Sequence, residues 1–474
     1  MAHRLPPELW AQIASYFQED RPTLAKCARV CRQWQPVFER FIYRKVKVES
    51  EEFQPKDGFI SLARFKTLAT ELRQAFVRRL EYTVVMPYDI PEYRATKLEG
   101  YNEKNAIRDA NNEAFQAGIL SLFEVLKSWK DDAKITITLV VQGRVRTLEP
   151  ETEANDHAKE WQGELRGERV VRPYRAQFAD DGDALVLPEV TCVDNLLVQY
   201  SYRPQRISPG GLSQIARHCV ALRRLHFDMP GKLRPDHVEY MRERREALAS
   251  GLSRLPSALQ VFDCMGSSEH PWSNTLPALD LRSANKIDVL SSSLQTSSLW
   301  PRLETNALDG VPENIPSGEW LFDYELSPGD EEDFPDPATG DEIFESRWLR
   351  EEYEISREKM KPEHLHRAFI SLGYASRQMP VLKLLSFGLA SSLRTVLTFT
   401  TSPGVIDLDP SCTHTPSSTR PLLHFRSDSA YRPDWRVADA WGFALDDMQV
   451  VDEGPREYYH RLVCSVALDR PRLD

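Results

Sequence analysis

The sequence predicts a mixed α/β protein, in which a short helical segment precedes a longer region of alternating strands and helices. Within residues 5–43, apolar side chains recur at helical spacing in three consecutive short blocks. Beyond them, runs rich in β-branched residues alternate with blocks of helical period. The 474 residues are 41% hydrophobic and 28% charged, which is enough for about two or three domains with a sizeable core.

The first helix is expected to begin at Pro6-Pro7, because proline is tolerated in a first helical turn and Glu8 suits the helix dipole there. One apolar stripe follows at i, i+4, i+7 and i+8, formed by Leu9, Ile13, Tyr16 and Phe17. The polar run at 18–21 ends this stripe.

Two more helices are expected after Asp20, where Pro22 and Thr23 give a second start signal. Their apolar stripes are Leu24, Cys27, Ala28 and Cys31 in the second helix, and Trp34, Val37, Phe38 and Phe41 in the third. Three helices of this length bury only a small core, so the unit is marginal alone. It should pack against the following region, and apolar surface left exposed is a candidate interface.

The order of residue types in this segment resembles the F-box family. LPPEL, an Ile four residues later and the run LAKCARVCRQW match its motif, and VFERFIYRKVKV is similar to the end of F-boxes in filamentous fungi. An ordinary helical start to a larger fold is the alternative. The resemblance implies that the helices bind a Skp-type adaptor, which bridges to a cullin and a RING subunit. The matching positions, with core and interface roles left open, are Leu5, Pro6, Pro7, Leu9, Ile13, Leu24, Val30, Cys31 and Trp34.

The next elements are predicted from periodicity. Residues 59–86 suggest a helix followed by a strand from Val77 to Val85. Residues 106–129 form the clearest helix, with Phe115 at the start of its buried stripe. ITITLVVQG at 135–143 is a strand by its β-branched content.

A strand–helix rhythm then continues with a period of about 30–45 residues. Strands are expected at 190–198, 222–227, 259–264 and 380–387, and helices at 209–218, 236–254 and 362–377. The rhythm resembles an irregular leucine-rich repeat, although the consensus Asn and strict leucine spacing are missing; a compact α/β domain is the alternative. The predicted organisation is therefore an F-box domain at 1–48 and an irregular leucine-rich-repeat-like region at 49–474 that recognises substrate.

The same region is similar to fungal F-box proteins in three places, namely 111–129, 300–322 and the passage MPVLKLLSF. A serine-rich stretch at about 265–300 departs from them, and a shrunken repeat and a gene-model error are both compatible with it.

Long loops are expected at about 144–183, 325–346 and 401–435, the first of them partly disordered. The acidic 325–346 segment does not match the spacing of a calcium loop, so a solvated loop is favoured.

The sequence offers no catalytic constellation, cofactor motif or metal site. GxSxG, P-loop, HExxH and kinase signatures are all missing. His364 and His366 lie two apart on a predicted helix, where they face different directions, and are read as surface or cap histidines. Cys27 and Cys31 are read as small core residues. The protein is expected to be non-catalytic.

Composition limits the classes of partner and the cellular compartments that we expect for this protein. The net charge of −11 disfavours a general nucleic-acid binder. The seven cysteines form no CxxC pair, which predicts a reducing cytoplasmic or nuclear setting. No apolar stretch is long enough for a secretory signal or a membrane span.

The predicted function is a substrate-recognition adaptor of an SCF-type ubiquitin ligase that recruits an unknown protein. A non-ligase scaffold that works with the Skp-type adaptor alone is the alternative, and an enzyme within residues 59–474 is a third. Near the C-terminus, Trp435 and Trp441 are expected to be core or edge-packing aromatics, with a binding surface as the second reading.

Overall fold

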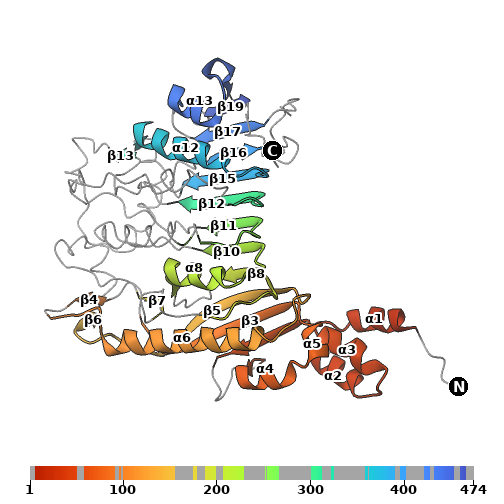
Figure 1. The fold of residues 1–474 in the computed structure, drawn as a ribbon. Coiled ribbons are helices and arrows are strands. Elements are labelled where there is room, and N and C mark those ends of the chain that lie inside the picture. Colours follow the sequence, from red (N-terminus) through yellow and green to blue (C-terminus); the bar gives the residue numbers. More distant parts are fainter. Residues whose placement is uncertain are drawn as a thin grey trace, which may run out of the picture. The chain divides into compact units, whose positions relative to one another are not determined.

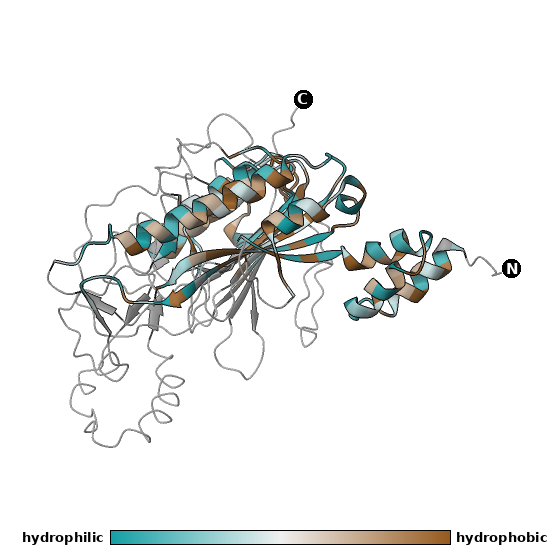
Figure 2. Ribbon diagram, turned by 90° about the horizontal axis from the view of Figure 1, so that it is seen from below, coloured by the Kyte–Doolittle hydropathy of each residue, from teal (hydrophilic) through white to brown (hydrophobic). Residues whose placement is uncertain are grey.

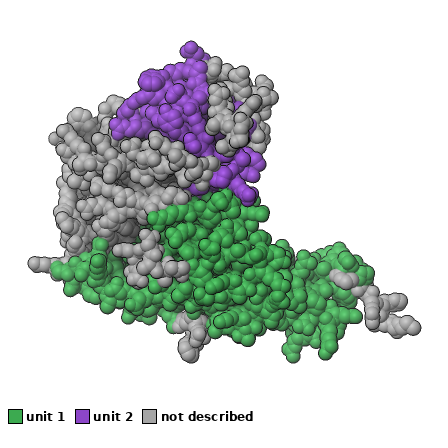
Figure 3. All heavy atoms as spheres, viewed as in Figure 1, with its two compact units in different colours: residues 1–227, 246–259 green, residues 228–245, 260–474 purple. Residues whose placement is uncertain are grey.

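The structure is a computed structural model, and its chain divides into two compact units (Figure 3). Unit 1 comprises residues 1–227 and 246–259, and unit 2 comprises residues 228–245 and 260–474. The residues described are 6–50, 58–90, 95–97, 100–154, 174–178, 187–198, 206–228, 251, 254–265, 300–311, 322–324, 358–360, 362–389, 396–401, 421–427, 432–452 and 460–465.

Unit 1 begins with three short helices that lead directly into a parallel sheet (Figure 1). The helices are α1 (Pro7–Ser15), α2 (Arg21–Ala28) and α3 (Trp34–Ile42). The sheet has the strand order β2-β1-β3-β5-β8-β10, and every neighbouring pair is parallel. Its strands are β1 (Lys45–Glu49), β2 (Ile60–Ser61), β3 (Arg79–Asp89), β5 (Ile135–Arg146), β8 (Val193–Val198) and β10 (Arg224–Asp228).

Helices connect these strands, as a succession of parallel strands requires. They are α4 (Leu62–Leu68), α5 (Glu71–Gln74), α6 (Ala106–Leu126) and α8 (Pro209–Arg217), and α6 and α4 run along one face of the strands (Figure 2). Two small sheets complete the unit, an antiparallel pair of β4 (Ala95–Lys97) with β6 (Thr152–Ala154) and a parallel pair of β7 (Arg175–Ala176) with β9 (Arg206–Ile207).

The core of unit 1 lies between α6 and the sheet. Phe115, Ile119 and Leu122 of α6 are buried, at the spacing that the sequence predicts. The alternate side chains of β3 that are buried are Leu80, Tyr82, Val84 and Met86. Gly118 allows the helix to approach this strand, because an added Cβ would lie 3.0 Å from Val84 Cγ1. The Tyr82 hydroxyl donates to the Gly118 carbonyl at 2.7 Å.

Unit 2 contains a sheet that is parallel in one part and antiparallel in the other. Its order is β11-β12-β15-β16-β17-β19-β18, in which β11, β12 and β15 are parallel and the later pairs are antiparallel. The strands are β11 (Val261–Met265), β12 (Thr305–Val311), β15 (Leu384–Leu389), β16 (Val396–Thr400), β17 (Leu422–Ser427), β18 (Gln449–Asp452) and β19 (His460–Ser465). A separate antiparallel pair is formed by β13 (Phe322–Tyr324) and β14 (Glu358–Met360).

Helices α12 (Pro362–Arg377) and α13 (Trp435–Trp441) belong to unit 2, with a short 3-10 helix, η3, at Leu445–Asp447. Trp441 is fully buried, and its indole N–H donates to the Phe369 carbonyl at 2.8 Å. Gly373 makes room for it, because an added Cβ would lie 2.8 Å from Trp441 Cδ1. The Trp441 indole is therefore a central part of the packing of α12 on α13.

The mixed α/β class is confirmed, with three N-terminal helices followed by a sheet-rich region. From β1 to β10 the strands of unit 1 lie in sequence order, as a βα repeat predicts, but β2 lies on the outer side of β1 and the later strands of unit 2 are antiparallel. The predicted helix at 59–76 is instead the short helices α4 and α5, which are separated by Ala69 and Thr70. Strand β12 was not predicted.

Two predicted loops contain ordered structure. The 144–183 loop includes Tyr174, Ala176 and Phe178, all buried, so this part of it belongs to the core. The 401–435 loop includes β17, which pairs with β16 and β19. The 325–346 loop lies outside the described residues, as do almost all of the 236–254 helix and the 265–300 stretch.

Candidate partner-binding surface

The three N-terminal helices are held in place by local signals in the sequence. Asp20 caps α2, since its carboxylate accepts from the Thr23 backbone N–H at 3.0 Å and from the Thr23 hydroxyl at 2.6 Å. These hydrogen bonds, the hydroxyl's first, lower the pKa of Asp20. A proline lies in the first turn of both α1 and α2, where its missing N–H costs the helix no hydrogen bond.

The centre of the three-helix unit is a small aromatic and aliphatic core. Leu24, Phe38 and Ala14 are buried there, and Trp10 and Trp34 pack against them with ring centroids 4.2 Å apart. Trp34 also stacks on Phe38 at 5.5 Å. The tryptophan in the family motif is thus part of the core in this chain.

The structure separates the predicted partner-binding residues by exposure. Leu24 is buried and the half-buried Trp34 packs against it, so these two support the helical core, while Ile13 is half-buried outside that cluster. The exposed ones are Pro6, Leu9, Val30 and Cys31, with Leu9 43% and Val30 61% exposed. Leu5 and the Pro7 side chain lie outside the described residues.

The exposure of Cys31 corrects the prediction that it is a core residue. Cys27, one turn earlier, is half-buried and packs against the helical core as predicted. Cys31 is exposed because Ala28 is the last residue of α2, so position 31 no longer continues its apolar stripe.

An ion pair attaches the three helices to the following region. Glu39 of α3 is buried, and it accepts from Arg73 of α5 at 2.7 and 3.3 Å and from Gln35 at 3.1 Å. The Arg73 guanidinium also lies over the Tyr43 ring, 4.9 Å from its centroid. Burial acts to raise the pKa of Glu39, but the hydrogen bonds from Arg73 and Gln35 outweigh it and lower the pKa. The pair therefore favours the charged carboxylate.

The connection between α3 and the sheet consists of only Tyr43 and Arg44. The Arg44 carbonyl accepts from the backbone N–H groups of Arg78, at 3.0 Å, and Arg79, at 2.9 Å. The Arg21 guanidinium donates to the Lys45 carbonyl. The path from the helices into β1 is thus fixed by hydrogen bonds on both sides.

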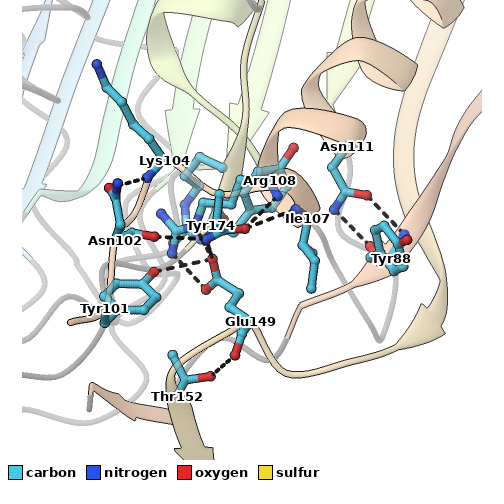
Figure 4. Close-up of polar contacts among 12 residues, drawn as sticks. Tyr88, Tyr101, Asn102, Lys104, Ile107, Arg108, Asn111, Glu149, Thr152 and Tyr174 are labelled. Atoms are coloured by element: carbon cyan, nitrogen blue, oxygen red, sulfur yellow. Dashed lines mark hydrogen bonds and ion pairs between the residues drawn. The ribbon is translucent and has the colours of Figure 1, made fainter. Parts of the chain in front are cut away.

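A second candidate lies at the carboxyl ends of β3 and β5, where parallel α/β sheets commonly bind ligands (Figure 4). Here Arg108 of α6 forms an ion pair with Glu149, and both side chains are nearly buried. Glu149 also accepts from Asn105 at 2.9 Å and from Tyr101 at 3.3 Å. Tyr174 lies over the same cluster, with the Arg108 guanidinium 6.0 Å from its ring centroid.

This cluster joins three separate parts of the chain. Asn105 caps α6 by accepting from the N–H groups of Ile107 and Arg108, and the Tyr174 hydroxyl donates to Asn112 at 2.8 Å. Asn111 exchanges two hydrogen bonds with the Tyr88 backbone, both at 3.0 Å. Because Glu149 is matched by Arg108 and neutral donors, the geometry favours a structural role for the cluster.

In unit 2, His366 is buried rather than a surface histidine, which corrects the prediction. Its Nδ1 lies 3.4 Å from Asp434 Oδ2, and its Nε2 lies 3.0 Å from the Arg432 carbonyl oxygen. Arg436 bridges Asp434 and Glu363, at 2.6 Å from each. Sequence reasoning missed this group because its members lie about 70 residues apart, on α12 and α13.

The two C-terminal tryptophans differ. Trp441 is a core residue, as predicted, whereas Trp435 is 68% exposed. The side chain of His364 lies outside those described. Among the described residues there is no group of three or more His, Cys, Asp or Glu side chains that could hold a metal ion. Within the same part of the chain, no helix is both long and apolar enough to cross a membrane.

Comparison with known proteins finds a matching family model for the N-terminal segment only. The F-box-like family model matches residues 2–48, which covers α1, α2, α3 and most of β1. A search of curated proteins finds no match to the chain. The match supports an F-box protein, and it coincides with the unit that leaves Leu9 and Val30 exposed.

Proposed function

We propose that this protein is the substrate-recognition adaptor of an SCF-type ubiquitin ligase. The three N-terminal helices would bind a Skp-type adaptor and, through it, a cullin and a RING subunit. Residues 49–474, the region compared above with an irregular leucine-rich repeat, would hold an unknown protein for ubiquitination. The contribution of such a subunit is proximity, because it raises the effective concentration of a target lysine.

The observation that carries this proposal is the exposure of apolar side chains on a segment that matches an F-box. In the three-helix segment, the exposed large apolar side chains are Leu9, Tyr16, Phe17 and Val30. On a unit whose core holds so few residues, this much exposed apolar surface favours a docking role. Leu24 and Trp34 would act on the partner only by holding the helices in position.

A double substitution tests the docking step directly. Leu9→Asp with Val30→Asp places charge on two exposed sites, so the fold should be kept while co-purification of a Skp-type adaptor is lost. The matched control is Leu72→Asp with Val145→Asp, the same residue types at 59% and 61% exposure outside the three helices. The control should bind the adaptor normally.

Circular dichroism must show that both variants are folded. Retained adaptor binding in the folded Leu9/Val30 variant would refute the docking assignment. The alternative function, a scaffold that works with the Skp-type adaptor alone, predicts that the adaptor co-purifies without a cullin. The same pull-down, probed for cullin, therefore distinguishes the ligase from the scaffold.

A further inference from the structure

Five exposed cationic residues lie close together along the backbone where α3 leads into the sheet. We call them the junction cluster, which consists of Arg21, Arg44, Lys45, Arg78 and Arg79. The backbone brings them together, since the Arg44 carbonyl accepts from both Arg78 N–H and Arg79 N–H. Lys45 is the register partner of Arg79, and the Arg21 guanidinium reaches the Lys45 carbonyl.

Little negative charge compensates the junction cluster. Among the described residues, its one carboxylate partner is Glu81, which lies 3.6 Å from Lys45 and is shared with Lys47 at 3.1 Å. In that same part of the chain, no carboxylate lies within ion-pair distance of any of the four arginines. Other cations of the described residues do have carboxylate partners, for example Arg73 with Glu39 and Arg108 with Glu149.

The cluster therefore reverses the sign of the protein's charge locally. The chain as a whole carries −11, so these arginines, which have no carboxylate partner among the described residues, form a distinct positive patch on an acidic molecule. Guanidinium groups bind carboxylates in a bidentate geometry, and exposed ones keep that capacity. An anionic partner is the chemistry that this patch fits.

The extent of the patch indicates what kind of anion it fits. It covers the starts of β1 and β3, which are neighbouring strands spaced by about 4.8 Å. Farther along the same sheet, Asp131 and Asp132 precede β5 beside Lys130 and Lys134, and Asp194, near the start of β8, pairs with Arg223 at 3.4 Å. Beyond β3 the charges are therefore of mixed sign, so the purely cationic stretch ends after two strands. A long polyanion such as a nucleic acid would have to run past these acidic residues, whereas a short peptide segment would not.

We infer that the junction cluster binds a short acidic segment of a partner protein. The arginine side chains receive its carboxylates, and the change to mixed charge beyond β3 limits the length of the segment that fits. Arg44 and Arg79 lie outside α1, α2 and α3, so this binding can be tested separately from the proposed adaptor docking.

A labelled octaglutamate peptide tests this inference with the full-length protein. The peptide should bind saturably, and binding should weaken as salt is raised from about 50 to about 300 mM. Arg44→Glu with Arg79→Glu should weaken it by at least about tenfold, equivalent to about 1.4 kcal/mol. Lys66→Glu with Lys127→Glu makes the same change in net charge at exposed sites on α4 and just after α6, and should have little effect.

Three outcomes would overturn the inference. The peptide could fail to bind saturably, or the control variant could weaken its binding as much as the Arg44/Arg79 variant does. A single-stranded oligonucleotide could also bind more tightly than the peptide. Should charge reversal prevent folding, Arg44→Gln with Arg79→Gln replaces it, and Arg44→Lys with Arg79→Lys should retain binding. All of these variants should still co-purify the Skp-type adaptor, so failure here is distinguishable from failure of the proposed function.

Discussion

In the three N-terminal helices the buried apolar residues are Ala14, Leu24 and Phe38, whereas α6 alone buries six apolar side chains against the sheet. The helices also leave Leu9 and Val30 exposed. The two regions of unit 1 thus distribute their apolar residues differently. The sheet region buries its apolar side chains in its own core, whereas the three helices leave some of theirs exposed at the surface. The difference indicates that the sheet region is stabilised by its own core and that the three helices are suited to binding a partner.

The largest expected loss of stability comes from a substitution in the sheet region. Phe115→Ala removes a fully buried ring from α6, so the free energy of unfolding should fall by about 3–5 kcal/mol. Chemical denaturation monitored by far-UV circular dichroism measures this. Leu72→Ala, at an exposed site, is the control and should change stability by less than about 0.5 kcal/mol. A small loss at Phe115 would contradict the view that α6 anchors the region.

A smaller and more local loss of stability is expected from a substitution in the three N-terminal helices. Leu24→Ala should cost about 2–3 kcal/mol, because the side chain is buried in a small core. Amide hydrogen exchange should show faster exchange in α1, α2 and α3 while β3 and β5 keep their protection. Equal loss of protection in β3 would show that the two regions unfold as one unit, which would erase the contrast between them.

The smallest effect concerns the ion pair that links the two regions. Glu39→Gln should cost about 1 kcal/mol at neutral pH, a value reduced because Arg73 is partly exposed to solvent. The folded state lowers the pKa of Glu39, so its contribution is present above the ordinary carboxyl value of 4.5 and is lost as pH falls through the folded pKa. The stability difference between wild type and variant should therefore shrink on acidification. A pH-independent difference would mean that the charge of Glu39 contributes nothing.

Much of the fold follows from local periodicity. The helix predicted at 106–129 is α6 at Ala106–Leu126, and the strand predicted at 135–143 is β5 at Ile135–Arg146. Both have strong signals, namely a regular apolar stripe in the first and β-branched residues in the second. Such elements can be predicted because the residues that define them are neighbours in the sequence.

The elements that were missed depend on distant partners. Tyr174 lies in a polar, charged stretch, and its burial comes from Arg108 and Asn112, more than 60 residues away. Strand β17 was assigned to a loop because its order comes from pairing with β16 and β19. For the candidate site, the sequence indicated the set of residues but not their roles, since exposure depends on how the three helices pack.

The two-residue connection between α3 and β1 has a consequence for changes in chain length. Each residue of an α-helix adds about 100° of rotation and about 1.5 Å of rise. Inserting a single residue into α3 would therefore turn α1, α2 and the exposed Leu9 and Val30 by roughly a quarter turn relative to the sheet. With the Arg44 carbonyl held by Arg78 and Arg79, the connection cannot absorb that rotation. Insertions and deletions in residues 34–44 should thus be far less tolerated than substitutions at the same positions.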